Sequence, residues 1–516
     1  MRTSPPSVQV KRNRVSIRTG LIAVLAFAWF SAYWIAIGEQ GTHLLPVVQR
    51  TWVMGLSSGY LAALVAVPLA FYCRTGPRTS RVLIGFGACT PIAFAPLTLA
   101  TALVQEPFNL DPYGSAVIVL SQALANLPIA FLLQVGTLML VHDNLIFASA
   151  TLGLEPRRTA RRLFGSRRRW SFVVSGMVAS LFAASDPSVS LVYGGTQSYL
   201  ASHIYRGLNA GMQPGAAIGA TLALLLPAVF LAIYLTRTIT SSWSASSLLA
   251  FGQSDVSTYF GRQRLYQFLS FALLALIGLV LVVIVVGALG VNIGEVLNVS
   301  TVLTTLVTVI AIVVSASLVG LWTARLSRRG SSSAFVVSFV LILSFLVSQT
   351  AIGMILSSLL RNAVIIGHTP VLPSLVGGGA FAGGYIAVGI AYLSIAAPIA
   401  HLTMSGILRS TTDLYDAALD NGAGRLRSVF TVLPAVAPRL VAMMAILSGI
   451  ILTRLSPILF VQPPGYAVPS TNLLTLASAG WDEHVFALGV VSAIIPVLAF
   501  AYAATHEFQG KGRKNA

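Results

Sequence analysis

Long apolar segments set the strongest limit on how this chain can fold. Each is about 20 residues long with few charges, the length that an α-helix needs to cross a bilayer. Inside lipid, helices and closed barrels alone satisfy their backbone hydrogen bonds, and uninterrupted apolar runs of this length favour helices. Twelve such segments can be marked: Leu21 to Ile37, Trp52 to Cys73, Val82 to Val104, Ser115 to Leu140, Ser171 to Leu191, Ala216 to Leu235, Phe268 to Leu289, Thr301 to Trp322, Ala334 to Leu356, Phe381 to Met404, Ala435 to Leu452 and Val485 to Ala504.

The scarcity of charged residues indicates the same class. Only 9% of the 516 residues are charged, and the mean hydropathy is +0.84. Soluble domains carry about 25% charged residues. We therefore expect an all-α membrane protein with about 12 transmembrane helices, in contact with the lipid bilayer along most of its length. Cys73 and Cys89 lie in or at the end of apolar segments, and neither a disulfide framework nor metal-ligand spacing is present.

Lysine and arginine are distributed unevenly between the two sides of this predicted arrangement. If the N-terminus is inside, 28 of the 32 basic residues fall in the tails and the even-numbered connections. The positive-inside rule then predicts that both termini are cytoplasmic. The net charge of +18 is mainly a topology signal, and we do not expect nucleic acid as a partner. The remaining four basic residues lie near the outer boundary: Arg50, Arg206, Arg361 and Arg454.

The stretch from Thr412 to Pro438 is the most polar long segment of the second half, and it separates two apolar runs. Asp413 can cap a helix start, with Asp416 three residues later in the position of a capping box. Gly422 is suited to the left-handed position that ends a helix. A second short helix is predicted to follow and to end at Pro434. This pattern predicts two short helices around a glycine break, exposed at a membrane surface.

The chain also repeats itself at a fixed offset. A shift of 269 residues carries Ala148 onto Ala417, Gly153 onto Gly422 and Pro227 onto Pro496. A repeat of this kind predicts two structural units in one chain. The divisions that follow are a tail (1–20), a first unit (21–235), a linker (236–267), a second unit (268–504) and a C-terminal tail (505–516). Each unit has six predicted spans, with a polar loop between its fourth and fifth.

Asp416, Ala417, Ala418, Gly422 and the Leu-Pro pair ending at Pro434 resemble the EAA loop of binding-protein-dependent ABC importer permeases. In that family the loop is the coupling helix that docks into a groove of the ATPase subunit. The chain departs from the pattern in two ways. Asp416 stands where the family has glutamate, and the gap from Gly422 to Pro434 is one residue short.

The first unit carries a weaker copy of the loop. Ala148 and Gly153 match the second copy, but Phe147 occupies the acidic position and no Leu-Pro pair follows. Two such loops would suit the two grooves of an ATPase dimer. The resemblance therefore implies two six-helix type I ABC importer permease repeats fused in one chain. It also implies no bound cofactor, and ATP hydrolysis in a separate partner rather than in this chain, which has no Walker A motif.

The fused layout most resembles permeases for ferric iron, with thiamine as the runner-up solute. By that resemblance, the partners are two copies of an ABC ATPase subunit and an extracytoplasmic solute-binding protein. The location implied is the bacterial inner membrane. The residues themselves do not identify the solute.

Three ionisable residues are candidates for the solute pathway. Asp186 and Arg454 each fall near the outer end of the span that follows an EAA-like loop, and each is followed by a proline and a polar stretch. Charges at this depth usually face a cavity or a partner, although interfacial charges at span ends are an equally good interpretation. His401 lies deep in the tenth span, where a packing histidine is the more common situation. No cluster of His, Cys and carboxylates has metal-site spacing.

A secondary transporter is the rival from another class, because it can also have twelve spans and a twofold repeat. Ion-coupled carriers usually show carboxylates or broken helices at the midplane. The sequence places no Asp or Glu in mid-span, and the EAA-like loops would then have no explanation. A membrane scaffold without transport activity has no positive support.

Overall fold

The computed structural model describes most of the chain as helices. The described residues are 41–141, 143–209, 224–225, 227–236, 257–260, 264–292, 294, 299–327, 332–366, 369–377, 381–456, 458–463 and 469–509. The predicted N-terminal tail and the first predicted span, Leu21 to Ile37, lie outside them. So do nearly half of the sixth predicted span, most of the linker and the last seven residues.

Seven described helices are long and apolar enough to cross a membrane. Their apolar character confirms the coarse expectation of a multi-span helical protein. The seven helices are α2 (Gly41–Thr75), α5 (Ser115–Met139), α14 (Arg264–Ala288), α16 (Val299–Ser327), α19 (Tyr385–Asp420), α20 (Arg425–Thr453) and α22 (Asp482–Gln509).

Two segments expected to be single spans are sharply bent instead. The segment 82–104 is divided into α3 (Arg78–Cys89), the 3-10 turn η1 (Thr90–Ala93) and α4 (Pro96–Val104), with a bend of 97°. The segment 334–356 is divided into α17 (Ser332–Leu346) and α18 (Gln349–Arg361), with a bend of 105°. Counting each bent pair as one span gives nine described spans, so the predicted twelve are not confirmed.

The causes of the two bends differ. At the first, Phe94 and Ala95 are extended and Pro96 starts α4. Proline restricts the residue before it to extended conformations, which separates the two helices. At the second there is no proline. There the side-chain amide of Gln349 donates to the carbonyl oxygens of Ser344 (3.3 Å) and Val347 (3.4 Å), which the break leaves without helical partners.

The fifth predicted span, Ser171 to Leu191, is also interrupted. The helix α8 (Gly165–Ser185) ends before Asp186, and a short helix, α9 (Ser188–Tyr193), follows. Of the sixth predicted span, the described part is a short apolar helix, Pro227–Thr236. Its Tyr234 stacks on Trp170 of α8, with ring centroids 5.7 Å apart.

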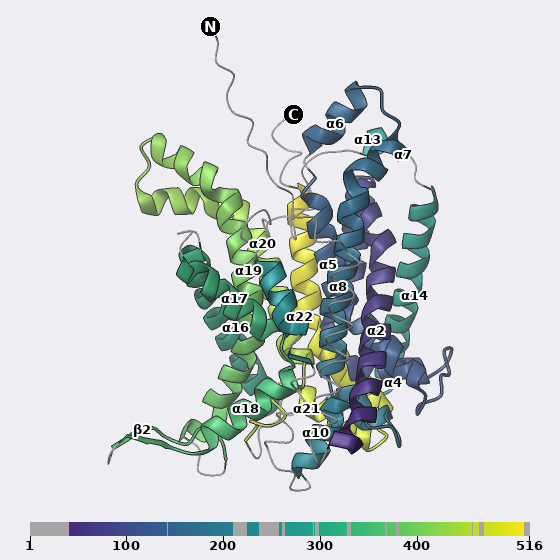
Figure 1. The fold of residues 1–516 in the computed structure, drawn as a ribbon, viewed down its shortest axis with the longest axis vertical. Helices are drawn as coiled ribbons and strands as arrows, with labels where there is room; N and C mark the ends of the chain where they lie inside the picture. The colour runs from purple at the N-terminus through teal and green to yellow at the C-terminus, as the bar shows by residue number, and fades with distance from the viewer. Residues whose placement is uncertain are drawn as a thin grey trace.

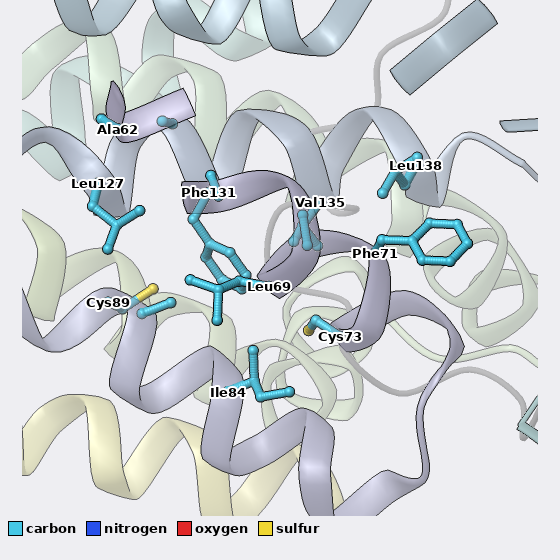
Figure 2. Packing of buried hydrophobic residues seen from close by; sticks show 14 of the residues in the cluster. Ala62, Leu69, Phe71, Cys73, Ile84, Cys89, Leu127, Phe131, Val135 and Leu138 are labelled. Carbon is cyan, nitrogen blue, oxygen red and sulfur yellow. The ribbon is translucent and has the colours of Figure 1, made fainter. Parts of the chain in front are cut away.

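The first unit is packed around α2, which contacts α5 and α8. A side chain at Gly59 would lie 2.3 Å from the backbone nitrogen of Ser180, so glycine is required where α2 meets α8. Figure 2 shows the core between α2, α3 and α5, where Leu69, Phe131 and the two free cysteines are buried. In the second unit, α19 is packed between α16 and α20.

The remaining elements lie at the two ends of the helical body. Figure 1 shows α6 (Asp143–Thr151) and α7 (Pro156–Thr159) at one end, with the projecting tip of the α19–α20 hairpin at the same end. At the opposite end lie α10 (Leu200–Asn209), α18 and α21 (Pro469–Ser478). The short antiparallel strands β1 (Val364–Ile366) and β2 (Thr369–Leu372), the turn η3 (Phe381–Gly384), the π-helical turn η2 (Ala160–Phe164) and α13 (Ser257–Phe260) complete the described elements.

Candidate functional site

The first loop, residues 143–164, contains a glycine turn after α6. Gly153 has φ of +69°. The N–H of Gly153 donates to the carbonyl of Ala150 (3.0 Å), and the N–H of Leu154 donates to that of Ser149 (3.1 Å). This is a Schellman motif with glycine in the left-handed position. Ala148 is exposed on α6.

The second loop, residues 412–434, contains the same turn 269 residues later. Gly422 has φ of +79°. Its N–H donates to the carbonyl of Leu419 (2.9 Å), and the N–H of Ala423 donates to that of Ala418 (3.1 Å). All four residues correspond to those of the first turn at a single offset. An added Cβ at either glycine would have nothing within 4 Å, so both turns are open to a partner.

The helices around the second turn differ from the expected pair of short helices. No helix starts at Asp413, because α19 runs without a break from its apolar segment to Asp420. Polarity alone does not end a helix, and no glycine or proline lies between Ile407 and Asp420 to interrupt it. Pro434 does not end a helix either, since it lies within α20.

The sequence-predicted coupling residues lie on the projecting hairpin. Asp416, Ala417 and Pro434 are exposed, and Ala418 is partly buried. The carboxylate and the small side chains therefore lie beside the open turn at Gly422. The arrangement offers a docking surface made of a charge, small side chains and a glycine turn.

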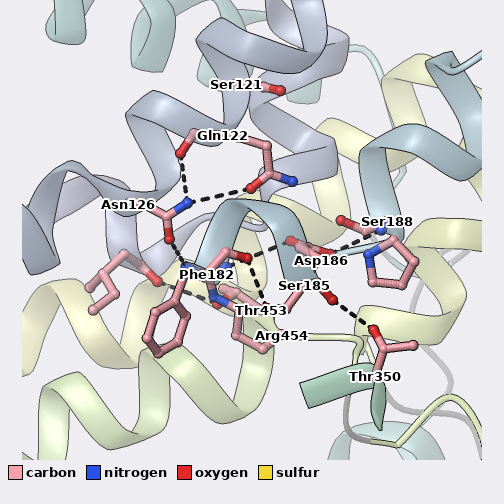
Figure 3. Close-up of polar contacts among 12 residues, drawn as sticks. Ser121, Gln122, Asn126, Phe182, Ser185, Asp186, Ser188, Thr350, Thr453 and Arg454 are labelled. Atoms are coloured by element: carbon pink, nitrogen blue, oxygen red, sulfur yellow. Dashed lines mark hydrogen bonds and ion pairs between the residues drawn. The ribbon is translucent and has the colours of Figure 1, made fainter. Parts of the chain in front are cut away.

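A buried ion pair joins the two predicted units. Nη1 of Arg454 lies 3.6 Å from Oδ2 of Asp186, and both side chains are almost inaccessible, with 7% and 3% exposed. From the sequence, the two charges are separate pathway candidates. The structure brings them together from the ends of α20 and α8 (Figure 3).

Both charged residues have further partners, as Figure 3 shows. Nη2 of Arg454 donates to Oδ1 of Asn126 on α5 (2.8 Å), and its guanidinium lies 5.7 Å from the centroid of the Phe182 ring. Oδ1 of Asp186 accepts from the backbone N–H of Ser188 at the start of α9 (2.9 Å). Removing two charges from water is costly, and such bonds offset part of that cost.

Four helix breaks converge around this ion pair. Asp186 and Arg454 themselves occupy the breaks after α8 and α20, with nearly identical extended backbones, φ −91° and ψ 115° against φ −90° and ψ 116°. The hydroxyl of Thr350, beside the α17–α18 break, donates to the carbonyl of Ser185 (2.6 Å). The hydroxyl of Thr453 lies 3.4 Å from the carbonyl of Ile92 in the α3–α4 break. Irregular backbone at this depth is tolerated where it is buried in protein or lines a pathway.

An apolar cavity of about 90 Å³ lies between the units. Its lining comes from both, through α5, α8 and the η1 turn on one side and α17, α19 and α20 on the other. Thr403 supplies the one polar side chain in a lining that otherwise consists of Ile92, Ile129, Leu132, Leu133, Val178, Leu235, Ile342, Phe345, Ile399, Leu402, Ile446 and Ile450. An apolar cavity therefore lies next to the polar network.

His401 is not part of this site. Its Nδ1 lies 3.0 Å from the hydroxyl of Thr323 on α16, and the side chain is buried. Ile399 and Thr403 of the same helix line the cavity. At 100° per residue, His401 is directed to the opposite side of α19. The contact with α16 favours the packing interpretation over the pathway interpretation.

Two residues of this region, Asn126 and Gln349, were not predicted from the sequence. Both are amides in otherwise apolar segments, and a buried amide needs hydrogen-bond partners, so their position was a usable signal. Among the described residues, no group of three or more His, Cys, Asp or Glu side chains is placed to hold a metal ion.

Comparisons with known proteins give no assignment: no family model, no curated protein and no solved structure matches this chain.

Proposed function

We propose that this chain is the membrane-spanning permease subunit of an ABC importer, with the solute pathway between its two units. The observation that carries the proposal is the pair of open glycine turns, Gly153 and Gly422. They share one hydrogen-bond pattern at an offset of 269 residues and project at the same end of the molecule. Two equivalent projecting turns suit two equivalent grooves of an ATPase dimer.

Further matched features support a repeat. The third predicted span of each unit is bent, by 97° and 105°. The fifth span of each unit ends at a charged residue with the same backbone conformation. Gly153 precedes Asp186 by 33 residues and Gly422 precedes Arg454 by 32. The π-helical turn η2 lies between Gly153 and Asp186, and a π turn accommodates one extra residue in a helix.

The pathway proposal rests on the interface between the two predicted units. There the Asp186–Arg454 pair and the broken helices adjoin an apolar cavity lined by both units. In this proposal two copies of a separate ATPase bind the projecting loops, and an extracytoplasmic binding protein delivers solute at the opposite end. The chain would lie in the bacterial inner membrane with both termini cytoplasmic.

A topology experiment tests the orientation. In a chain with Cys73 and Cys89 replaced by alanine, a single cysteine at Asn421 or Trp481 should behave differently in intact cells. The Trp481 position should react with a membrane-impermeant maleimide, and the Asn421 position should react only after the membrane is permeabilised. Both side chains are exposed, so burial would not mask either result. Labelling of Asn421 from outside would overturn the orientation.

Ferric iron is the first solute candidate and thiamine the second. Cells lacking the gene should lose uptake of one of these two at limiting concentration and keep the other, and the wild-type gene should restore the lost uptake. Loss of thiamine uptake alone would reject iron and retain the importer class. Unchanged uptake of both would reject both solutes.

An ion-coupled carrier remains the second candidate, because one observation favours it. Asp186 is a buried carboxylate among broken helices, and carriers of that class bind their coupling ions in such places. ATP dependence separates the two. An importer requires ATP hydrolysis by a partner, whereas a carrier works in sealed vesicles supplied with an ion gradient alone.

A further inference from the structure

The described part of the linker is bound to the first loop. The short helix α13 (Ser257–Phe260) places the hydroxyl of Tyr259 2.8 Å from the hydroxyl of Thr159 in α7. The same hydroxyl donates to the carbonyl of Leu154, directly after the glycine turn, at 2.5 Å. Tyr259 of the linker therefore contacts the first loop at two places, at Leu154 after the glycine turn and at Thr159 in α7.

Aromatic packing fixes the same segment to the helices below it. Phe260 is 5% exposed, and its ring centroid lies 6.1 Å from that of Phe164 in the π turn. Tyr266, in the first turns of α14, packs on Phe71 of α2, with centroids 4.7 Å apart. Its hydroxyl accepts a hydrogen bond from Nη1 of Arg168 (3.0 Å). Burial of large aromatic side chains makes this attachment stronger than two hydrogen bonds alone.

The loop held in this way exposes an unusual surface. Leu145, Phe147 and Leu152 are 50%, 40% and 77% exposed, although all three are large apolar side chains.

The start of the first loop is held as well, since Arg74 of α2 forms an ion pair with Asp143 and donates to the carbonyl of Val141 (3.0 Å). At the second turn, by contrast, the described hydrogen bonds join residues of that hairpin to one another.

We propose that α13, the short helix in the linker between the predicted units, is a brace that fixes the position of the first loop, with Tyr259 as its positioning residue. The first loop lacks the acidic residue and the Leu-Pro ending of the second, but it has the contact with α13, whereas the hydrogen bonds described at the second turn stay within its own hairpin. A linker that only connected the two units would need no buried aromatic residue and no bond to the turn. The consequence for ATPase docking rests on the proposed function, whereas the brace itself does not.

Hydrogen–deuterium exchange of the full-length chain in lipid nanodiscs tests the brace. Tyr259→Phe removes the hydroxyl and keeps the ring, so the fold should be retained. Losing about two hydrogen bonds of roughly 1 kcal/mol each should raise amide exchange at residues 149–160 about five- to thirtyfold. Exchange at residues 418–424 of the second loop should not change. Tyr415→Phe, a matched tyrosine change within the second loop, should leave exchange at 149–160 as in wild type.

Substitutions of Thr159, the hydrogen-bond partner of Tyr259, test the brace independently. Thr159→Val removes one of the two hydrogen bonds and should raise exchange at 149–160 about fivefold, and Thr159→Ser, which keeps the hydroxyl, should not. Unchanged exchange in Tyr259→Phe and Thr159→Val would overturn the brace, and so would an equal rise in both loops. If exchange rises locally but the loops prove to bind no ATPase, the brace stands and the proposed function fails.

Discussion

Replacing Arg454 by methionine is expected to give the largest loss of stability of any single change proposed for this chain. The substitution leaves Asp186 buried at 3% exposure without its counter-charge and leaves Oδ1 of Asn126 without its donor. Breaking a buried pair by removing one partner costs about 3–5 kcal/mol. Unfolding of the purified protein by titration with SDS in mixed micelles should show a decrease of this order.

The double variant distinguishes a specific pair from general damage. Asp186→Asn keeps the size of the side chain and an oxygen that can accept from the N–H of Ser188, while removing the charge. The double variant Asp186→Asn/Arg454→Met leaves no uncompensated charge, so it should recover most of the stability that Arg454→Met loses. Losses that simply add in the double variant would show that the two residues act independently, and would contradict the pairing.

Replacing Gly422 by leucine is expected to abolish ATP-driven transport while the protein still reaches the membrane. At φ of +79° a side-chain-bearing residue costs about 1–2 kcal/mol. Nothing within 4 Å would meet the new Cβ, so the chain itself has room for it. The added side chain would instead occupy the surface that, in the proposed function, docks into the ATPase groove. Co-purified ATP hydrolysis and solute uptake measure the effect.

Matched variants identify the cause of the transport loss expected in Gly422→Leu. Gly422→Asn should retain most of the activity, because asparagine tolerates the left-handed conformation better than other residues. Asp416→Lys should act like Gly422→Leu, since it inverts an exposed charge beside the turn. Gly153→Leu should impair transport less, because the first loop is the degenerate copy. Normal uptake in Gly422→Leu cells would remove the coupling assignment.

The turns and the helical character could be predicted from the sequence because they depend on local chemistry. A run of about 20 apolar residues favours helical structure in lipid because its backbone groups must bond to one another. A glycine with suitable neighbours gives a left-handed cap. Gly422 has the predicted positive φ because that conformation is decided by the residue itself and by the helix that it ends.

Whether a helix continues or bends depends on more than local chemistry. The sequence predicted a helix start at Asp413, but a helix already running through the preceding span continues because adding a residue costs less than starting a new helix. The break between α17 and α18 has no proline to signal it. The side chain of Gln349 makes it possible, and only the structure shows which carbonyl groups that amide reaches.

The ion pair could not be predicted, because it joins residues in different units. Asp186 and Arg454 can each be identified from their positions near the outer ends of predicted spans, yet those positions do not say which charge faces which. Their contact depends on how α8 and α20 are placed by the packing of both units, with Asn126 of α5 as a third contributor. Asn126 and Gln349, two amides in apolar segments, are the sequence signal that points to this polar region.

Site-specific photo-cross-linking in cells tests the central claim most directly. A photoreactive amino acid at Asp416 or Ala148, both exposed on the projecting loops, should cross-link to one and the same partner, and mass spectrometry should identify that partner as an ATPase with a Walker A motif. The same probe at Trp481, which is exposed at the opposite end, should not capture it. Capture of the ATPase from both loops is the result that the account predicts. Efficient cross-linking at Asp416 and Ala148 to proteins that bind no ATP, or to lipid alone, would contradict it.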